Sequence, residues 1–393
     1  MDRAALPGVR HAVRFVIGPD GRDDPEPVSD SAFRIIDANV NRAREALRVM
    51  EEYARFVLDD ACLTEALKQA RHELTDAIRS FNKGEGTASD AGSGPESLVR
   101  SRDTEGDIGR TITAGSEYDR ADPDAVALAA GKRLSEALRV IEEYGKTSDA
   151  AFASRIERLR YRGYELERRL ALTVSARRRF AQIRLYVIIT ESLCRGDWLA
   201  TAEAALRGGA GCLQLREKTF SDRALLQRAK ALAALCRRYK ALCIVNDRPD
   251  VSAAAGADGV HLGRDDLPIE AVRRILPPHM LVGVSTHTVA QVEEAASRAP
   301  DYLAVGPMFP TETKPQNHVA GPDTLRAARQ RTGLPLVAIG GITSENIGRV
   351  LAAAPCIPCV CRAVAGAGDP EDAARRLVTQ VEASTSADSG AQP

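Results

Sequence analysis

From Arg184 onward, short apolar segments alternate with amphipathic helical stretches, and this alternation restricts the fold more than any other feature of the chain. Eight segments rich in Val, Ile and Leu fit into roughly 200 residues, and a helix-like stretch follows each one. Their ranges are 184–190, 212–218, 241–247, 259–263, 281–287, 302–310, 335–342 and 357–364. This number of strand–helix units in this length predicts a compact (β/α)8 barrel, an α/β fold. A doubly wound open sheet is the alternative.

Polar side chains collect where the predicted strands end, and a barrel places its active site at those carboxyl ends. The residues with this bias are Gln214, Arg216, Lys218, Asn246, Asp247, Asp265, Asp266, Ser285, Thr286, His287, Thr311, Glu312, Thr313, Lys314, Gly340, Gly341 and Arg362. An open sheet does not predict this distribution. The pattern therefore favours the barrel, with these residues around one cavity.

The segment CLQLREK at 212–218 indicates which way one strand faces. Side chains alternate between the two faces of a strand, so Gln214, Arg216 and Lys218 share one face and the two leucines between them share the other. On an exposed edge strand this would be ordinary amphipathicity. In a closed barrel, we expect the polar face to point into the mouth.

The charges at these strand ends predict an anionic ligand and a metal ion. Arg216, Lys218 and Lys314 would place positive charges at the mouth, and cations without a partner are costly to bury. Asp247 and Asp266 suit a hard divalent cation, and Mg²⁺ commonly links carboxylates to substrate phosphates. Together they indicate a pyrophosphate bound with Mg²⁺. The alternative is that these charges only pair with one another.

The first part of the chain has helical periodicity instead. Apolar residues recur every three or four positions from Ala32 to about Leu172, which predicts an all-helical domain at 31–175 ahead of a barrel at 180–383, with a short polar junction between them. The sequence EALRVMEEY at 45–53 recurs as EALRVIEEY at 136–144. A duplicated helical hairpin with surface Arg–Glu pairs is the simplest interpretation. A ligand site built from both copies is the alternative.

Composition and residue patterns exclude several partner classes. Lys+Arg and Asp+Glu both total 54, so no bulk charge favours nucleic acid, and no apolar run approaches the ~18 residues of a membrane span. The cysteines fall mostly in apolar segments, as expected of reduced thiols in a cytoplasmic protein, and the trio Cys356, Cys359 and Cys361 lacks a fourth ligand for a metal. We expect disorder in a leader at 1–30 and a tail at 384–393.

Several motifs occur in order along the second part of the chain and together resemble the thiamine-phosphate synthases. They are CLQLREK, VNDR, GADGVHLGRDD, GVSTH, AVGPMFPTETK and PLVAIGGIT, and the resemblance covers about 183–383. It implies a transferase that joins hydroxymethylpyrimidine pyrophosphate to hydroxyethylthiazole phosphate, giving thiamine phosphate and pyrophosphate. It further implies small-molecule substrates and Mg²⁺ as cofactor. A homo-oligomer is compatible with it.

The resemblance also implies roles for individual residues. Those implied to hold the pyrimidine pyrophosphate are Gln214, Arg216, Lys218 and Asn246, those for Mg²⁺ are Asp247 and Asp266, those for the pyrophosphate are Ser285 and Lys314, and those for the thiazole phosphate are Thr311, Thr313, Gly341, Cys361 and Arg362. Arg216, Lys218 and Lys314 are expected to act catalytically by stabilising the leaving group. The chain departs from the usual family motifs in two places: it has Arg264 where members often have Gln, and its last strand reads PCIPCVCRAV. His261 and His287 are candidate bases or structural histidines.

Alternatives stay open for both parts of the chain. RIIDANVNRAREALRVMEEYARF resembles a domain fused ahead of some thiamine-phosphate synthases, proposed to phosphorylate hydroxymethylpyrimidine phosphate. It contains no phosphate-binding loop of the G-x-x-x-x-G-K-[ST] type, so a non-catalytic module for dimerisation or channelling is the alternative. For the barrel, the rivals are a thiazole tautomerase, which needs no metal, and a barrel that binds thiazole phosphate as a regulator. Release of pyrophosphate distinguishes all three.

Overall fold

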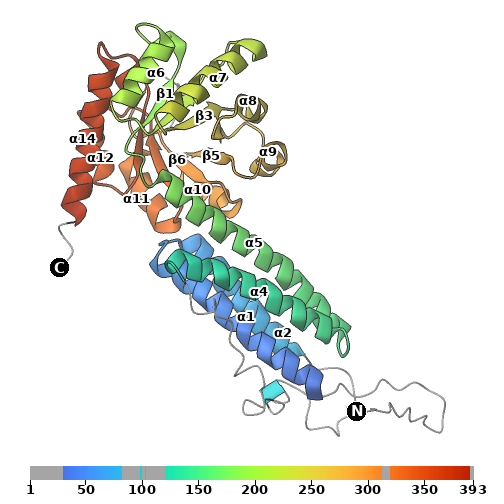
Figure 1. Cartoon of the computed structure of the whole chain (residues 1–393). Coiled ribbons are helices and arrows are strands. Elements are labelled where there is room, and N and C mark those ends of the chain that lie inside the picture. Colours follow the sequence, from blue (N-terminus) through green and yellow to red (C-terminus); the bar gives the residue numbers. More distant parts are fainter. Residues whose placement is uncertain (1–29, 82–97, 100–101, 103–119, 312–318, 390–393) are drawn as a thin grey trace, which may run out of the picture.

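The structure consists of a helical half and a barrel half (Figure 1). It is a computed structural model that describes residues 30–81, 98–99, 102, 120–311 and 319–389 of the 393-residue chain. The barrel has eight parallel strands in sequential order, closed by pairing of β1 with β8. The predicted fold class, an α/β barrel preceded by an all-α region, is confirmed.

Each strand of the barrel falls within the range expected from the apolar segments. The strands are β1 (Tyr186–Ile189), β2 (Cys212–Leu215), β3 (Leu242–Asn246), β4 (Gly259–Leu262), β5 (Leu281–Thr286), β6 (Tyr302–Val305), β7 (Leu336–Ile339) and β8 (Ile357–Val360). The elements around them are η2 (Glu191–Leu193), α6 (Trp198–Arg207), α7 (Asp222–Arg238), α8 (Pro249–Ala255), α9 (Ile269–Ile275), α10 (Val289–Ser297), α11 (Gly321–Arg331), α12 (Ile347–Leu351), α13 (Arg362–Ala365) and α14 (Pro370–Ser389).

The alternation along each strand separates two cores. Leu213 and Leu215 are almost fully buried in the outer core, between the strands and the helices. Cys212 belongs to a smaller inner core inside the barrel, and Gln214 of the same face is also buried. The polar face of CLQLREK therefore points inward, as its pattern predicts.

The helical half is built from long helices that pack side by side (Figure 1). They are α1 (Asp30–Phe56), α2 (Ala61–Ser80), α4 (Pro123–Gly145) and α5 (Ala150–Phe180). The side chains of Asp60, Asp122 and Asp149 cap α2, α4 and α5 by accepting a hydrogen bond from the third backbone amide that follows. Such caps satisfy amides that have no partner within the helix.

The repeated sequence forms matching parts of α1 and α4, which pack against each other. The apolar positions of both copies are fully buried: Leu47, Met50, Leu138 and Ile141. On the outer face, Arg48 pairs with Glu52 at 2.5 Å, and Arg139 pairs with Glu143 at 2.7 Å. Burial of these apolar residues and pairing of these charges is what the duplicated-hairpin interpretation predicts.

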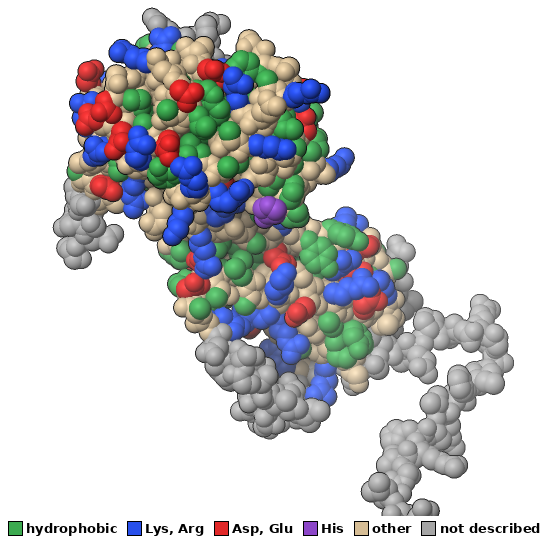
Figure 2. Space-filling view, turned by 45° about the horizontal axis from the view of Figure 1, so that its top comes forward, with side chains coloured by type: hydrophobic (Ala, Val, Ile, Leu, Met, Phe, Trp, Pro, Cys, Tyr) green, Lys and Arg blue, Asp and Glu red, His purple; other side chains and the backbone are tan. Residues whose placement is uncertain are grey.

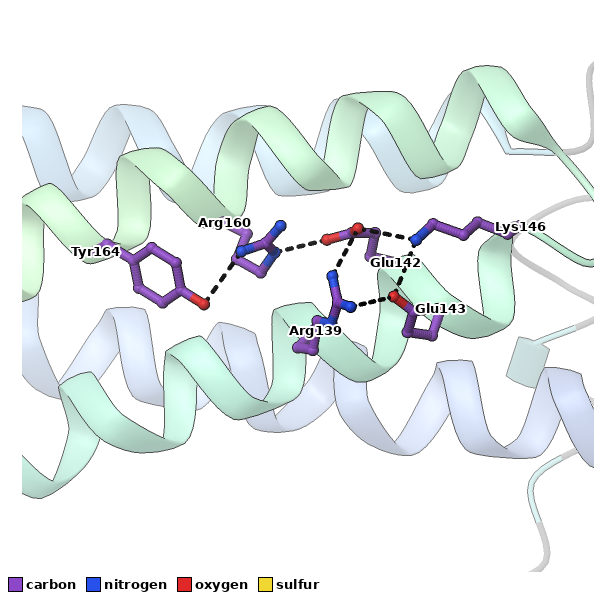
Figure 3. A network of polar contacts seen from close by, with 6 residues as sticks. All are labelled: Arg139, Glu142, Glu143, Lys146, Arg160 and Tyr164. Atoms are coloured by element: carbon purple, nitrogen blue, oxygen red, sulfur yellow. Dashed lines mark hydrogen bonds and ion pairs between the residues drawn. The ribbon is translucent and has the colours of Figure 1, made fainter.

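Each copy of the repeat also buries one glutamate against an arginine from the next helix. Glu51 of α1 accepts from Arg71 at 2.9 Å, and Glu142 of α4 accepts from Arg160 at 2.6 Å. Figure 3 shows the second network, in which Arg160 also donates to the hydroxyl of Tyr164. Removing one partner of such a buried pair would leave a charge without compensation, so these contacts support the bundle.

The junction between the halves is helical, which corrects the expectation of a short polar linker near residues 175–179. Helix α5 continues through it to Phe180. Arg179 donates to the carbonyl oxygen of His279 at 2.8 Å and to Asp258 at 3.1 Å, so the end of this helix docks onto the barrel. Phe180 is buried in the inner core, and its ring packs 5.0 Å from that of Tyr302.

Contacts between the halves lie at the amino ends of the strands. Arg179 contacts Asp258, which directly precedes β4, and His279, which lies two residues before β5. Ahead of β7, the amide of Gly333 donates to Asp60 of the helical half at 2.9 Å. The helical half is therefore attached at the end of the barrel opposite the carboxyl ends of the strands.

The ends of the chain and its surface can also be compared with the expectations from the sequence. The predicted leader lies outside the described residues, apart from Asp30. The disordered tail is predicted to begin at residue 384, but α14 continues to Ser389. No helix among the described residues is long and apolar enough to cross a membrane. Basic and acidic side chains are interspersed over the face seen in Figure 2.

Candidate active site

A cavity of about 550 Å³ lies at the carboxyl ends of the strands, and every strand contributes to its lining. The predicted site residues among its lining are Gln214, Arg216, Lys218, Asn246, Asp247, Asp266, Ser285, Thr311, Gly341, Cys361 and Arg362. Thr313 and Lys314 lie outside the described residues. The strand-end pattern thus brings together side chains that are far apart in the sequence.

Arg216 is placed to bind an anion. Its backbone amide donates to the carbonyl oxygen of Ile189 at 2.9 Å, so the pairing of β1 with β2 continues one residue beyond the strand and keeps this side chain on the inward face. The guanidinium lines the cavity, and it makes no hydrogen bond or salt bridge with any residue in the described ranges. A partly buried cation of this kind favours a charged ligand.

Lys218 is partly neutralised within the site. Its ammonium nitrogen lies 3.3 Å from an oxygen of Asp247, so some of the charges at the mouth do pair with one another. Asp247 itself has a positive φ of 62°, an uncommon backbone conformation for a residue other than glycine. Its amide is held by the carbonyl oxygen of His261 at 2.8 Å. Strained conformations of this kind often occur at functional sites.

Asp266 forms a carboxylate pair with Asp247. One oxygen of Asp266 accepts from the amide of Gly263 at 2.6 Å. The pKa of Asp266 is raised, first because the group is partly buried and then because the Asp247 carboxyl is adjacent. A pair of adjacent carboxylates fits a divalent cation, which would relieve the repulsion between their negative charges.

Other ligands would have to complete such a metal site. The described part of the chain has no cluster of three or more His, Cys, Asp or Glu side chains placed to hold a metal ion. Mg²⁺ commonly keeps several water or substrate ligands and takes only one or two carboxylates from the protein. The carboxylate pair therefore fits Mg²⁺ better than a metal that needs a full set of protein ligands.

The two candidate histidines are both held by the barrel. The imidazole of His261 is buried and lies between the hydroxyls of Tyr302, at 3.1 Å, and Ser285, at 2.9 Å. The ring of His287 lies 2.5 Å from the carbonyl oxygen of Gly306. These contacts favour structural roles. Tyr302 and Tyr186, whose hydroxyls meet inside the barrel, occupy inward positions in their strands, but no motif in the sequence marks either of them.

Glycines shape the far side of the cavity. Gly340 and Gly341 both have positive φ, and a Cβ on Gly341 would come within 2.7 Å of the carbonyl oxygen of Pro310. The divergent last strand still forms, and its Cys359 pairs in register with Tyr186 of β1. The cavity wall next to Cys361 and Arg362 is therefore intact despite the unusual sequence.

Two family models match the chain, one on the barrel half and the other on the helical half. The family model described as "Thiamine monophosphate synthase" matches residues 185–364, and the model described as "ThiD2 family" matches residues 34–169. A thiamine-phosphate synthase of Rhodopirellula baltica is 41% identical over 334 residues, which are 82% of this chain and 85% of that protein. One from Thermosynechococcus vestitus is 41% identical over 350 residues, 88% of this chain and 94% of that protein.

Among solved structures, the chain is similar to a thiamine phosphate pyrophosphorylase from Pyrococcus furiosus. The two share 36% sequence identity with a TM-score of 0.48, and the match covers 52% of this chain and 97% of that one.

Proposed function

The chain belongs to the thiamine-phosphate synthase family, and from that membership we propose how its cavity carries out the reaction. The enzyme condenses hydroxymethylpyrimidine pyrophosphate with hydroxyethylthiazole phosphate and releases pyrophosphate. The observation that carries the proposed site is the cavity at the strand ends, which is lined both by Arg216, without a salt-bridge partner among the described residues, and by the carboxylate pair of Asp247 and Asp266.

The proposed roles are those that membership of the family implies; the residues that carry them line the cavity, apart from Thr313 and Lys314, which lie outside the described residues. Gln214, Arg216, Lys218 and Asn246 hold the pyrimidine pyrophosphate, while Ser285 and Lys314 contact its pyrophosphate group. The thiazole phosphate is held by Thr311, Thr313, Gly341, Cys361 and Arg362. Asp247 and Asp266 would hold Mg²⁺, which supplies positive charge beside the departing pyrophosphate.

The proposed reaction is a displacement at the exocyclic methylene of the pyrimidine. The carbon–oxygen bond to pyrophosphate breaks and its electron pair leaves with the pyrophosphate, while the lone pair of the thiazole nitrogen forms the new carbon–nitrogen bond. Arg216 and Lys218 stabilise the charge that develops on the leaving group. The cavity walls hold the two substrates in line. A neutral ring nitrogen is already nucleophilic, so no general base is needed, which agrees with the structural contacts of both histidines.

A tautomerase built on the same barrel would use neither the metal nor the cations. We therefore expect full-length protein, given both substrates and Mg²⁺, to form thiamine phosphate and pyrophosphate in equal amounts. A chelator should abolish this turnover, and added Mg²⁺ should restore it. Quantifying both products by chromatography checks the prediction. Isomerised thiazole without release of pyrophosphate would contradict it.

For the helical half we propose phosphorylation of hydroxymethylpyrimidine phosphate, the reaction that supplies the barrel with its substrate. The match of residues 34–169 to the ThiD2 family favours this over a purely structural module. Because α5 continues to Phe180, a fragment cut at residue 175 would lose the end of that helix. The full chain with its barrel disabled is therefore the better test.

The full-length Asp247→Asn variant is expected to convert ATP and hydroxymethylpyrimidine phosphate to ADP and the pyrophosphate ester, which then accumulates because the barrel cannot use it. Both products should appear together, and neither should form when the pyrimidine is left out. Coupled detection of ADP and mass spectrometry of the ester provide the measurement. ADP formation no higher than in the reaction without pyrimidine would leave the helical half as a non-catalytic module.

A further inference from the structure

Beneath the cavity, a chain of hydrogen bonds crosses the interior of the barrel. The amide nitrogen of Gln214 donates to the hydroxyl of Tyr186 at 2.6 Å, and that hydroxyl lies 3.2 Å from the hydroxyl of Tyr302. Nδ1 of His261 is 3.1 Å from the Tyr302 hydroxyl, and Nε2 is 2.9 Å from Oγ of Ser285. The inner members are buried, while the two ends line the cavity. They come from β1, β2, β4, β5 and β6.

The number of available protons favours one direction along this chain. Tyr186 accepts from Gln214, and a phenol has a single proton to pass on. If Tyr186 donates to Tyr302 and Tyr302 donates to Nδ1 of His261, then Nε2 carries the ring proton and donates to Ser285. The Ser285 proton is then left to point into the cavity. Every buried group in the chain is satisfied in this order.

The opposite order satisfies the chain less well. Tyr186 would then accept from both Gln214 and Tyr302, and its own proton would be left to the sulfur of Cys212, a weak acceptor. Ser285 would donate inward to His261 and offer only lone pairs to the cavity. Lone pairs repel an anionic oxygen, whereas a hydroxyl proton binds one.

The ring of Tyr302 is fixed by its neighbours as well as by its hydroxyl. It packs against the His261 ring at 5.6 Å between centroids and against Phe180 at 5.0 Å. Gly283 lies beside it, and a Cβ there would come within 2.0 Å of the ring. Since the ring cannot shift easily, its hydroxyl has a defined position between Tyr186 and His261.

We propose that Tyr186 and Tyr302 are positioning residues for the condensation, which hold Gln214 in place at one end of the chain and present the Ser285 hydroxyl as a donor at the other. The anionic group that Ser285 would meet is the pyrophosphate of the substrate. This inference rests on the proposed function, in which Gln214 and Ser285 contact the pyrimidine pyrophosphate.

A double-mutant cycle separates a positioning role from a structural one. Tyr302→Phe keeps the ring but removes the hydroxyl, and we expect kcat/KM for the pyrimidine pyrophosphate to fall roughly tenfold to a hundredfold. Inhibition by inorganic pyrophosphate should weaken in parallel, while KM for the thiazole phosphate should stay at the wild-type value. If Tyr302 acts through Ser285, the double variant Tyr302→Phe/Ser285→Ala should be no worse than Ser285→Ala alone.

Controls distinguish the ways in which this inference can fail. Tyr53→Phe removes a partly buried hydroxyl, bonded to Asp124 in the helical half, and should leave the barrel's kinetics unchanged. Wild-type kinetics in Tyr302→Phe, or additive losses in the double variant, would overturn the inference while leaving the proposed site standing. Wild-type kinetics in Ser285→Ala would overturn the inference together with the proposed role of Ser285.

The other end of the hydrogen-bond chain provides a second measurement if Tyr302→Phe does not fold. Tyr186→Phe should raise KM for the pyrimidine pyrophosphate and add little in a background that already carries Gln214→Ala. Melting temperatures of all variants report whether the barrel is intact. An additive loss at this end would also overturn the positioning role.

Discussion

Replacement of either carboxylate of the proposed metal pair is expected to lower kcat by on the order of a hundredfold or more without unfolding the barrel. Asp247→Asn and Asp266→Asn each keep the shape of the side chain but remove one negative charge. The remaining carboxylate would hold Mg²⁺ less tightly, so the apparent Mg²⁺ requirement should rise. Steady-state kinetics over a Mg²⁺ titration, together with melting curves, checks both effects.

Asp265 provides the matched control because it is adjacent in sequence, carries the same charge and also lines the cavity, but its side chain is exposed. Asp265→Asn should reduce kcat by less than about threefold, as expected for an exposed charge. Full activity of Asp247→Asn or Asp266→Asn at limiting Mg²⁺ would remove the metal assignment from this pair.

Arg216→Ala is expected to lower kcat/KM for the pyrimidine pyrophosphate by roughly a hundredfold, because a charge-assisted hydrogen bond to a phosphate oxygen is lost. Charge grows on the leaving group in the transition state and strengthens that contact, so kcat should fall as well as affinity. Arg216→Lys should recover only part of the loss, since lysine keeps the charge but not the planar fork. Steady-state kinetics of the two variants provides the measurement.

Glu217 is the control for the direction in which this segment faces. It is not part of the cavity lining, and its carboxylate accepts from the backbone amide of Glu191 at 2.6 Å. The side-chain oxygen of glutamine can accept the same bond, so Glu217→Gln should have little effect on pyrophosphate affinity. Damage equal to that of Arg216→Ala would show that the inward-facing site is misassigned.

Much of the barrel could be predicted from the sequence because its signals are local. Each apolar segment contains its strand, and alternation within CLQLREK correctly places Gln214 and Arg216 inside and the leucines outside. Period-two patterning needs only neighbouring residues, and closure of the barrel then brings the strand ends together. This is why most of the candidate site was found without a structure.

The features that escaped prediction depend on contacts between distant segments. The hydroxyls of Tyr186 and Tyr302 meet across the barrel although 116 positions separate them, and neither tyrosine looks unusual within its own strand. The run of arginines at 177–179 has the composition of a linker. It forms the end of α5, where Arg177 and Arg178 bind distant residues of the helical half and Arg179 binds the loops before β4 and β5.

Attachment of the helical half at the amino ends of the strands has a consequence for the proposed supply of substrate from the helical half to the barrel. Phe180, Tyr186 and Tyr302 pack into the inner core beneath the cavity, so within the described residues these side chains occupy the interior of the barrel between the helical half and the cavity. A pyrimidine pyrophosphate made by the helical half would have to diffuse through solvent around the outside of the barrel. A competing enzyme added in excess should then intercept it. Fusion would keep the helical half and the barrel in equal number, but it would not channel the intermediate from one to the other.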